Sequence, residues 1–254
     1  KNIQREERSK KYTVEQGRRD CGRQRIVELI CNNKFIYKHL IIVISGEILK
    51  EYVMEFIGAM FLLLAIALTG NPLAIGMMLM AMVYIGGHIS GAHYNPAVTI
   101  AVWMRGKLKP NKILGYMSAQ ILGTFAASFI FYLLSGKFFL PSPGIEVPIW
   151  HSILVEILFT FILCSVILFV ATSKKSEGNH IYGIAIGLAL AAGAYAGGSI
   201  SGGVYNPAVA LGPMILKSFI GGYAFSNLVI YIIGPFAGAI FAAWVFRYLN
   251  PKEN

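Results

Sequence analysis

The string YNPAV occurs twice, at residues 94–98 and 205–209, and each copy opens a short apolar segment. The Asn-Pro pair is typical of a helix start, because Asn caps free backbone N–H groups and Pro fits the first helical position. The apolar segments cover only about 95–104 and 206–216, too little to cross a bilayer. Half-length helices at membrane depth are tolerated only where their ends are buried in protein or face a water-filled cavity. The chain must therefore bury these helix ends in protein or build such a cavity.

Long apolar blocks surround the two short segments. Hydrophobic residues make up 56% of the 254 residues and charged residues 13%, with a mean hydropathy of +0.62, whereas a soluble domain carries roughly a quarter charged residues. Because a spanning helix needs about 20 apolar residues, the blocks predict an all-α membrane protein. The six predicted spans are 51–70, 71–87, 112–134, 150–171, 182–200 and 225–248.

Spans and short segments repeat as one unit of three spans, with the short helix between the second and the third. VMEFIGAMF (53–61) matches LVEILFTF (154–161), and YMSAQILGTFAA (116–127) matches YIIGPFAGAIFA (231–242). An odd number of spans makes the two copies insert with opposite orientations, so that the short helices meet by their N-termini near the midplane. The expected organisation is a first repeat at 46–134, a connecting loop at 135–149, a second repeat at 150–248 and a tail at 249–254.

Basic residues indicate the orientation in the membrane. Lys and Arg cluster in the N-terminal region, in 105–112, at 174–175 and at the C-terminal end, and six spans put all four segments on one side. By the positive-inside rule that side is cytosolic, so both termini are expected in the cytosol.

Residues 1–45 are expected to form a basic cytosolic extension. Residues 1–40 carry eleven Lys/Arg and five Asp/Glu, which places +6 of the chain's +10 there. The polar first part is expected to be flexible, and 25–45 to lie along the membrane surface, where basic residues attract anionic lipids. A mitochondrial targeting segment, a docking segment for a protein partner and a plug for the pore are the alternatives.

In this setting the two motifs resemble those of the major intrinsic protein, or aquaporin, family. The resemblance covers about 51–248 and rests on HISGAHYNPAVT (88–99), SGGVYNPAVALGP (201–213), one Glu in the first helix of each half, and the sets Tyr116/Gln120/Gly123 and Tyr231/Pro235/Gly238. It implies an aquaporin-like fold with six transmembrane helices and two re-entrant half-helices. It also implies a passive channel for water and small neutral solutes that assembles as a homotetramer.

The resemblance assigns the pore to Asn95, Pro96, Ala97, Asn206, Pro207 and Ala208. A capping Asn spends its side-chain oxygen on its own helix, which leaves the amide NH₂ free to point into a pore. The two half-helix N-termini add positive charge behind these amides, and that field opposes cations. The alternative is that both Asn residues only cap helices.

Glu55 and Glu156 are the only carboxylates well inside a predicted span. A charge at that depth costs several kcal/mol, so each needs partners or a functional reason. In the family, the matching glutamates brace the re-entrant loops through hydrogen bonds, and His93 is the expected partner of Glu55. A proton relay is the alternative, although no Asp, Lys or Arg lies well inside a span to complete it.

Val209 follows the second Asn-Pro-Ala, where channels of this family usually carry an Arg. Counting back from the two Asn residues, the other constriction positions are Ile75, Ala194 and Gly203. Four apolar residues predict a wide, uncharged constriction that passes water, ammonia, urea, hydrogen peroxide or glycerol, unless Tyr195 swings in to narrow it. NPAVALGP is similar to the same stretch in plant tonoplast intrinsic proteins.

Other classes of function find little support in the sequence. It shows no nucleophile–base set, phosphate loop or metal spacing, and its three cysteines give no disulfide framework. We therefore expect no enzyme activity, no cofactor, no metal and no nucleic-acid partner. A closed, aquaporin-like structural or assembly subunit of a larger membrane complex is the second hypothesis. An ion-coupled transporter is a third, and it would need an ionisable pathway.

Overall fold

The structure is a computed structural model that describes residues 46–253. The chain separates into two compact units, Lys1–Leu49 and Lys50–Asn254, and the fold below is that of the second. The predicted basic extension at 1–45 lies outside the described residues.

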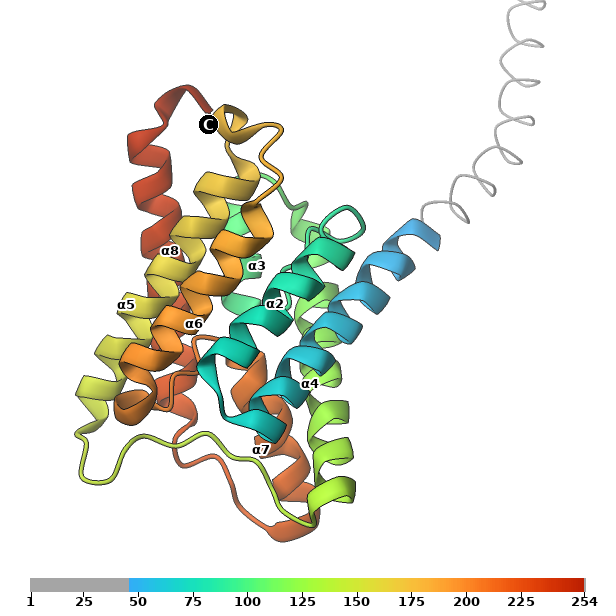
Figure 1. Cartoon of the computed structure of the whole chain (residues 1–254), viewed down its shortest axis with the longest axis vertical. Coiled ribbons are helices and arrows are strands. Elements are labelled where there is room, and N and C mark those ends of the chain that lie inside the picture. The colour runs from blue at the N-terminus through green and yellow to red at the C-terminus, as the bar shows by residue number, and fades with distance from the viewer. Residues whose placement is uncertain (1–45, 254) are drawn as a thin grey trace, which may run out of the picture. The chain divides into compact units, whose positions relative to one another are not determined.

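The described chain consists of α-helices joined by loops and short turns (Figure 1). No β-strand occurs between residues 46 and 253, in agreement with the predicted all-α class. A π-helical turn, Leu168–Thr172, continues α5, and a 3-10 turn, Pro251–Glu253, follows α8. The helices are the first helix Gly46–Thr69, α2 Pro72–Gly86, α3 Pro96–Met104, α4 Ile113–Ser135, α5 Ile149–Ile167, α6 Tyr182–Ser201, α7 Pro207–Gly221 and α8 Leu228–Leu249.

Three helices begin at an Asn-Pro pair. The side-chain oxygens of Asn71, Asn95 and Asn206 each accept a hydrogen bond from the backbone N–H two residues later, and Pro occupies the first helical position. These caps satisfy N–H groups that have no partner inside the helix. The starts of α2, α3 and α7 thus follow from local sequence.

Five of the described helices are long and apolar enough to cross a membrane. The remaining predicted span, 71–87, corresponds to α2. This helix has only 15 residues and covers about 22 Å of a hydrocarbon core roughly 30 Å thick. α7 also has 15 residues and runs past the end predicted for it at 216. The apolar run ends there at Lys217, but backbone hydrogen bonding does not require an apolar side chain, and the helix continues.

Close helix packing depends on glycine. A Cβ atom at Gly76 in α2 would collide with the carbonyl oxygen of Gly187 in α6, and one at Gly187 would collide with that of Gly76. Likewise Gly123 of α4 meets the backbone of the first helix at Phe56, and Gly238 of α8 meets that of α5 at Ile157. Small residues allow such close contact between membrane helices. The same contact recurs in both repeats.

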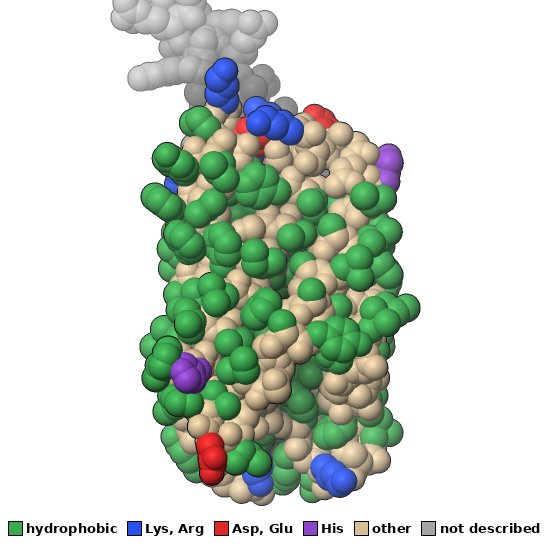
Figure 2. Space-filling model, turned by 60° about the vertical axis from the view of Figure 1, so that its left-hand side comes forward, with side chains coloured by type: hydrophobic (Ala, Val, Ile, Leu, Met, Phe, Trp, Pro, Cys, Tyr) green, Lys and Arg blue, Asp and Glu red, His purple; other side chains and the backbone are tan. Residues whose placement is uncertain are grey.

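The half-helices α3 and α7 lie in opposite halves of the bundle, and their N-terminal ends meet between them (Figure 1). Around them, the outer face is a hydrophobic band, with Lys, Arg, Asp and Glu side chains near its two ends in the view of Figure 2. Such a band fits a lipid environment. The observed fold is the predicted inverted repeat.

Candidate functional site

Glu55 holds the first re-entrant loop, residues 87–95, from inside the bundle. Its Oε1 accepts hydrogen bonds from Ser90 Oγ (2.6 Å) and His93 N (2.9 Å), and its Oε2 accepts from Tyr94 N (2.6 Å) and Gln120 Nε2 (2.7 Å). The carboxylate is fully buried. Four donors fill its acceptor sites, which offsets part of the cost of burying the charge.

Glu156 holds the second re-entrant loop, residues 202–206, in the same way. Its Oε1 accepts from Ser201 Oγ (2.8 Å) and Val204 N (2.9 Å), and its Oε2 accepts from Tyr205 N (2.6 Å). This carboxylate is also fully buried. Both glutamates thus bind backbone that no helix satisfies.

His93 meets Glu55 through its backbone and not through its ring. The ring nitrogen Nδ1 lies 3.2 Å from Thr99 Oγ1, in the first turn of α3. Thr99 Oγ1 in turn donates to Asn95 O (3.0 Å) and accepts from Gln120 Nε2 (3.0 Å). The sequence pointed to the contact between His93 and Glu55 but not to Thr99, because Thr99 becomes a neighbour only when the loop turns into α3.

Tyr94 and Tyr205 precede the two capping Asn residues in left-handed backbone, with φ of 52° and 50°. This region is unusual for a bulky residue. Their hydroxyls anchor them, since Tyr94 donates to Met82 O (2.9 Å) and Tyr205 donates to Gly193 O (2.8 Å). The left-handed turn points both tyrosine carbonyls at the opposite loop.

The two Asn side chains cross-link the loops at the centre of the bundle. Each Oδ1 caps its own helix, accepting from Ala97 N (2.8 Å) or Ala208 N (3.0 Å). Asn95 Nδ2 donates to Tyr205 O (2.8 Å), and Asn206 Nδ2 donates to Tyr94 O (2.9 Å). An amide nitrogen carries two hydrogens, so one is used in this cross-link and one remains on each Asn.

A cavity of about 370 Å³ contains these amides, and we call it the first cavity. All four expected constriction residues, Ile75, Ala194, Gly203 and Val209, line it together with Asn95 and Asn206. The connecting loop also reaches it through residues 139–142. Tyr195 does not line it, and its side chain is 63% exposed on the outside of the bundle.

A second cavity, of about 840 Å³, opens on the other side of the Asn pair. His93 and Ile167 line both cavities, so these two residues lie between the two spaces. The second cavity lies between the loop after α3 and the loop between α5 and α6. Four lysines line it, Lys107, Lys109, Lys112 and Lys174.

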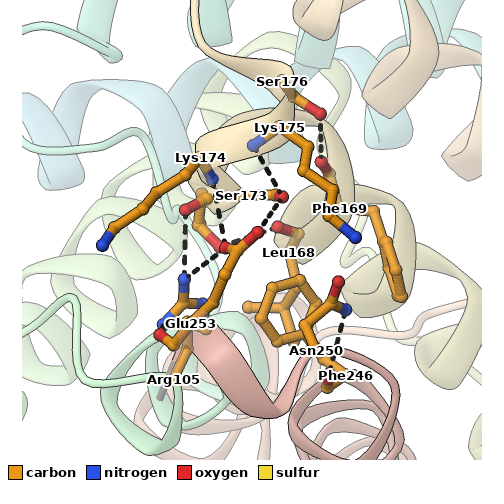
Figure 3. Close-up of polar contacts among 11 residues, drawn as sticks. Arg105, Leu168, Phe169, Ser173, Lys174, Lys175, Ser176, Phe246, Asn250 and Glu253 are labelled. Carbon is orange, nitrogen blue, oxygen red and sulfur yellow. Dashed lines mark hydrogen bonds and ion pairs between the residues drawn. The ribbon is translucent and has the colours of Figure 1, made fainter.

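The tail closes over one end of the bundle through Glu253, which contacts Arg105, Ser173 and Lys174 (Figure 3). Together with Thr172, whose carbonyl accepts from Arg105, these residues form what we call the tail clamp. Arg105 Nη2 lies 2.9 Å from Glu253 Oε2, and Nη1 donates to the Glu253 carbonyl at 2.7 Å. Ser173 Oγ donates to Glu253 Oε1 (2.8 Å), and Lys174 N donates to Oε2 (3.1 Å).

Neighbouring groups in the tail clamp stabilise the ionised form of Glu253. The hydrogen bond from Ser173, more than the nearby Arg105 charge, holds the pKa of Glu253 below its usual value. Arg105 Nη2 also reaches the carbonyl of Thr172 (3.4 Å), and its guanidinium lies 4.7 Å from the Phe246 ring. Sequence reasoning missed this pairing, since Arg105 and Glu253 are 148 positions apart.

Comparisons with known proteins agree with this geometry. The family model described as "Major intrinsic protein" matches residues 23–246. Aquaporin NIP2-1 of Oryza sativa subsp. japonica is 33% identical over 231 residues, covering 87% of this chain and 76% of its own length. Aquaporin AqpM of Methanothermobacter marburgensis is 36% identical over 190 residues, covering 71% and 76%.

The fold is similar to a solved structure. The aquaglyceroporin from Plasmodium falciparum superposes with a TM-score of 0.72 at 23% identity, covering 81% of this chain and 98% of that one. At this identity the likeness concerns the fold alone. The relatives above are named NIP2-1 and AqpM, whereas the stretch NPAVALGP is similar to that of plant tonoplast intrinsic proteins and leaves the subfamily open.

Proposed function

Because the chain belongs to the major intrinsic protein family, we propose that it forms a passive transmembrane channel for water and small neutral solutes. The family is one of channels for water or small solutes in membranes. The path runs from the first cavity, past the Asn pair, into the second cavity.

The observation that carries this proposal is the placement of Asn95 and Asn206. Both line the first cavity, and each keeps one amide hydrogen after its cross-link to the opposite tyrosine carbonyl. A water or solute oxygen at this point would meet two donors. The closed alternative, in which the residues act only as caps, gives no reason for them to line a cavity.

Cation exclusion is part of the proposal. α3 and α7 present their N-terminal ends to the same point, and each adds roughly half a positive charge there. Val209 adds no charge, so these helix ends form the main barrier to cations. Glu55 and Glu156 accept hydrogen bonds from loop N–H groups and from a Ser hydroxyl each. We propose that they hold the loops and take no part in proton transfer.

The solute range follows from the constriction residues. Ile75, Ala194, Gly203 and Val209 offer no side-chain donor and no large ring. We propose that urea, ammonia, hydrogen peroxide and glycerol are candidate solutes beside water.

The proposal also includes orientation and assembly. Arg105, Thr172 and Glu253 meet at one end, while Lys217 lies at the other, 4.3 Å from the Phe138 ring. By the positive-inside rule the first of these ends faces the cytosol. We propose a homotetramer with one pore per subunit, as in the family, and contact of the basic N-terminal region with anionic lipids.

Stopped-flow light scattering on proteoliposomes containing the whole chain tests the channel. Wild type should pass water and urea faster than empty liposomes. Val209→Arg should lose urea first, because it adds volume and charge to the constriction. Val209→Leu is the matched control for volume without charge, and Tyr195→Ala, outside the pore, should behave as wild type.

The alternative functions predict different results. If wild type passes no solute faster than empty liposomes, the channel proposal fails and a closed structural subunit is favoured. If Val209→Arg leaves urea flux unchanged, the assigned constriction is wrong although the channel stands.

A further inference from the structure

A continuous chain of buried hydrogen bonds leads from Glu55 to the ring of His93. It begins at Gln120, whose Nε2 lies 2.7 Å from Glu55 Oε2 and 3.0 Å from Thr99 Oγ1. A carboxylate accepts and cannot donate. The Gln120 amide is therefore oriented with its nitrogen toward Glu55, because the flipped orientation would set oxygen against oxygen. Nε2 then gives one hydrogen to Glu55 and the other to Thr99.

Thr99 transmits this orientation through its hydroxyl. A hydroxyl has one hydrogen to donate and two lone pairs. Gln120 occupies one lone pair, and the hydrogen goes to Asn95 O, a carbonyl that can only accept (3.0 Å). Such a bond to the carbonyl four residues earlier is common for Thr in helices. Only one lone pair is left to face His93 Nδ1 at 3.2 Å.

The histidine must therefore donate from Nδ1. A neutral imidazole has one N–H, and its other nitrogen is an acceptor. With the hydrogen on Nδ1, Nε2 is that acceptor. No hydrogen bond joins Nε2 to another described residue. The fully buried polar atoms that lack a partner do not include Nε2, so this atom is accessible from the cavities that His93 lines.

We infer that His93 Nε2 is a fixed hydrogen-bond acceptor in the pore, held in that state by Thr99 and Gln120. This inference rests on the proposed channel function and names the atom that receives a hydrogen from the permeating solute. Asn95 and Asn206 donate to a solute oxygen, and His93 accepts from a solute O–H or N–H on the side of the second cavity. The pore thereby favours solutes that both accept and donate, such as water and urea.

The second repeat supports a specific role for this chain of bonds. The positions that correspond to His93, Thr99 and Gln120, counted from the Asn and the Tyr of each repeat, are Val204, Ala210 and Pro235. The second loop is held by Glu156 without any of these polar groups. The fold therefore does not need them to brace a re-entrant loop.

Solid-state NMR of the whole chain with ¹⁵N-labelled histidine, in proteoliposomes near neutral pH, reads the tautomer directly. The chain has five histidines, and a His93→Asn spectrum identifies the His93 signals by difference. We expect hydrogen on Nδ1 and none on Nε2. A wild-type signal with hydrogen on Nε2 would overturn the inference without reference to any transport measurement.

Three variants test the positioning residues. Thr99→Val removes the hydroxyl and should shift His93 to a mixture of tautomers, while Thr99→Ser keeps the hydroxyl and should keep the wild-type signal. Thr124→Val is the matched control, because Thr124 is equally buried but bonds Ala208 O in the other half of the bundle. An unchanged His93 signal in Thr99→Val would show that Thr99 does not hold the tautomer.

Flux measurements separate this inference from the channel proposal. Thr99→Val should lower water and urea permeability roughly two- to tenfold, the effect of one lost hydrogen bond, with Thr99→Ser and Thr124→Val near wild type. A changed tautomer with unchanged flux would show that the solute does not use Nε2, although the channel stands. A wild type that conducts nothing would reject the channel, whatever the tautomer.

Discussion

The two re-entrant loops have the same backbone scaffold but different polar neighbours. In each, a buried Glu accepts from a Ser hydroxyl and two loop N–H groups, and a left-handed Tyr directs its carbonyl to the opposite Asn. Only the first loop adds the set Gln120, Thr99 and His93. The shared contacts satisfy the polar groups of non-helical backbone inside a membrane. The additional set of Gln120, Thr99 and His93 is not needed for that purpose, and we propose that it acts in the pore.

The outer ends of the half-helices differ as well. Arg105, at the end of α3, is buried and pairs with Glu253, while Lys217, near the end of α7, lies over the Phe138 ring. In both cases a cation meets an aromatic ring, since Arg105 also lies over Phe246. The α3 end adds an ion pair, which connects it to the chain's last described turn.

The largest expected effect comes from removing either buried Glu. Glu55→Ala leaves four donors without an acceptor and Glu156→Ala leaves three, at about 1–3 kcal/mol for each group. Both variants should lose most folded protein, measured as the monodisperse fraction in detergent, with Glu55→Ala affected more. A milder effect at Glu55 than at Glu156 would mean that Gln120 finds another partner.

A smaller effect is expected at the outer ends of α3 and α7. Arg105→Met breaks a buried ion pair and two further hydrogen bonds, whereas Lys217→Met loses a cation–π contact of about 0.5–1 kcal/mol. Thermal unfolding in detergent should show the larger drop in melting temperature for Arg105→Met. Equal drops would indicate that the tail clamp is dispensable for stability.

The two tyrosine hydroxyls should give nearly equal effects. Tyr94→Phe and Tyr205→Phe each remove one buried bond to a helix carbonyl, at about 1 kcal/mol. Equal losses, measured by thermal unfolding, would support an equivalent scaffold in the two loops. A clear inequality would show that one loop depends on its tyrosine more than the geometry indicates.

The smallest effect concerns acid. The folded-state pKa of Glu253 is lowered, first by the Ser173 hydrogen bond. Its contribution to stability is therefore complete above the unfolded-state pKa, near 4.5, and is lost as pH falls through the lower folded-state pKa. Glu253→Gln should show a smaller loss of melting temperature than wild type between about pH 5 and 3. Identical profiles would exclude a pH-dependent tail clamp.

Much of the fold could be read from local sequence. The Asn-Pro pairs mark the starts of α2, α3 and α7 because both residues act within one helical turn. The end of α7 was placed too early, since apolar content is a poor guide to where backbone hydrogen bonding stops. The span predicted at 71–87 exceeds α2 only by Asn71 and Gly87, the capping residues at its two ends.

The sequence by itself determined a membrane-embedded inverted repeat with two capped half-helices, since composition, periodicity and capping are local properties. Only the tertiary structure decided which residues far apart in the sequence bind one another. Each Asn amide donates to the opposite Tyr carbonyl, Gln120 donates to Glu55, and Arg105 pairs with Glu253. These contacts join residues whose separation in space depends on how all the helices pack. Residue types in the chain show that such groups need partners, and packing selects which partners they find.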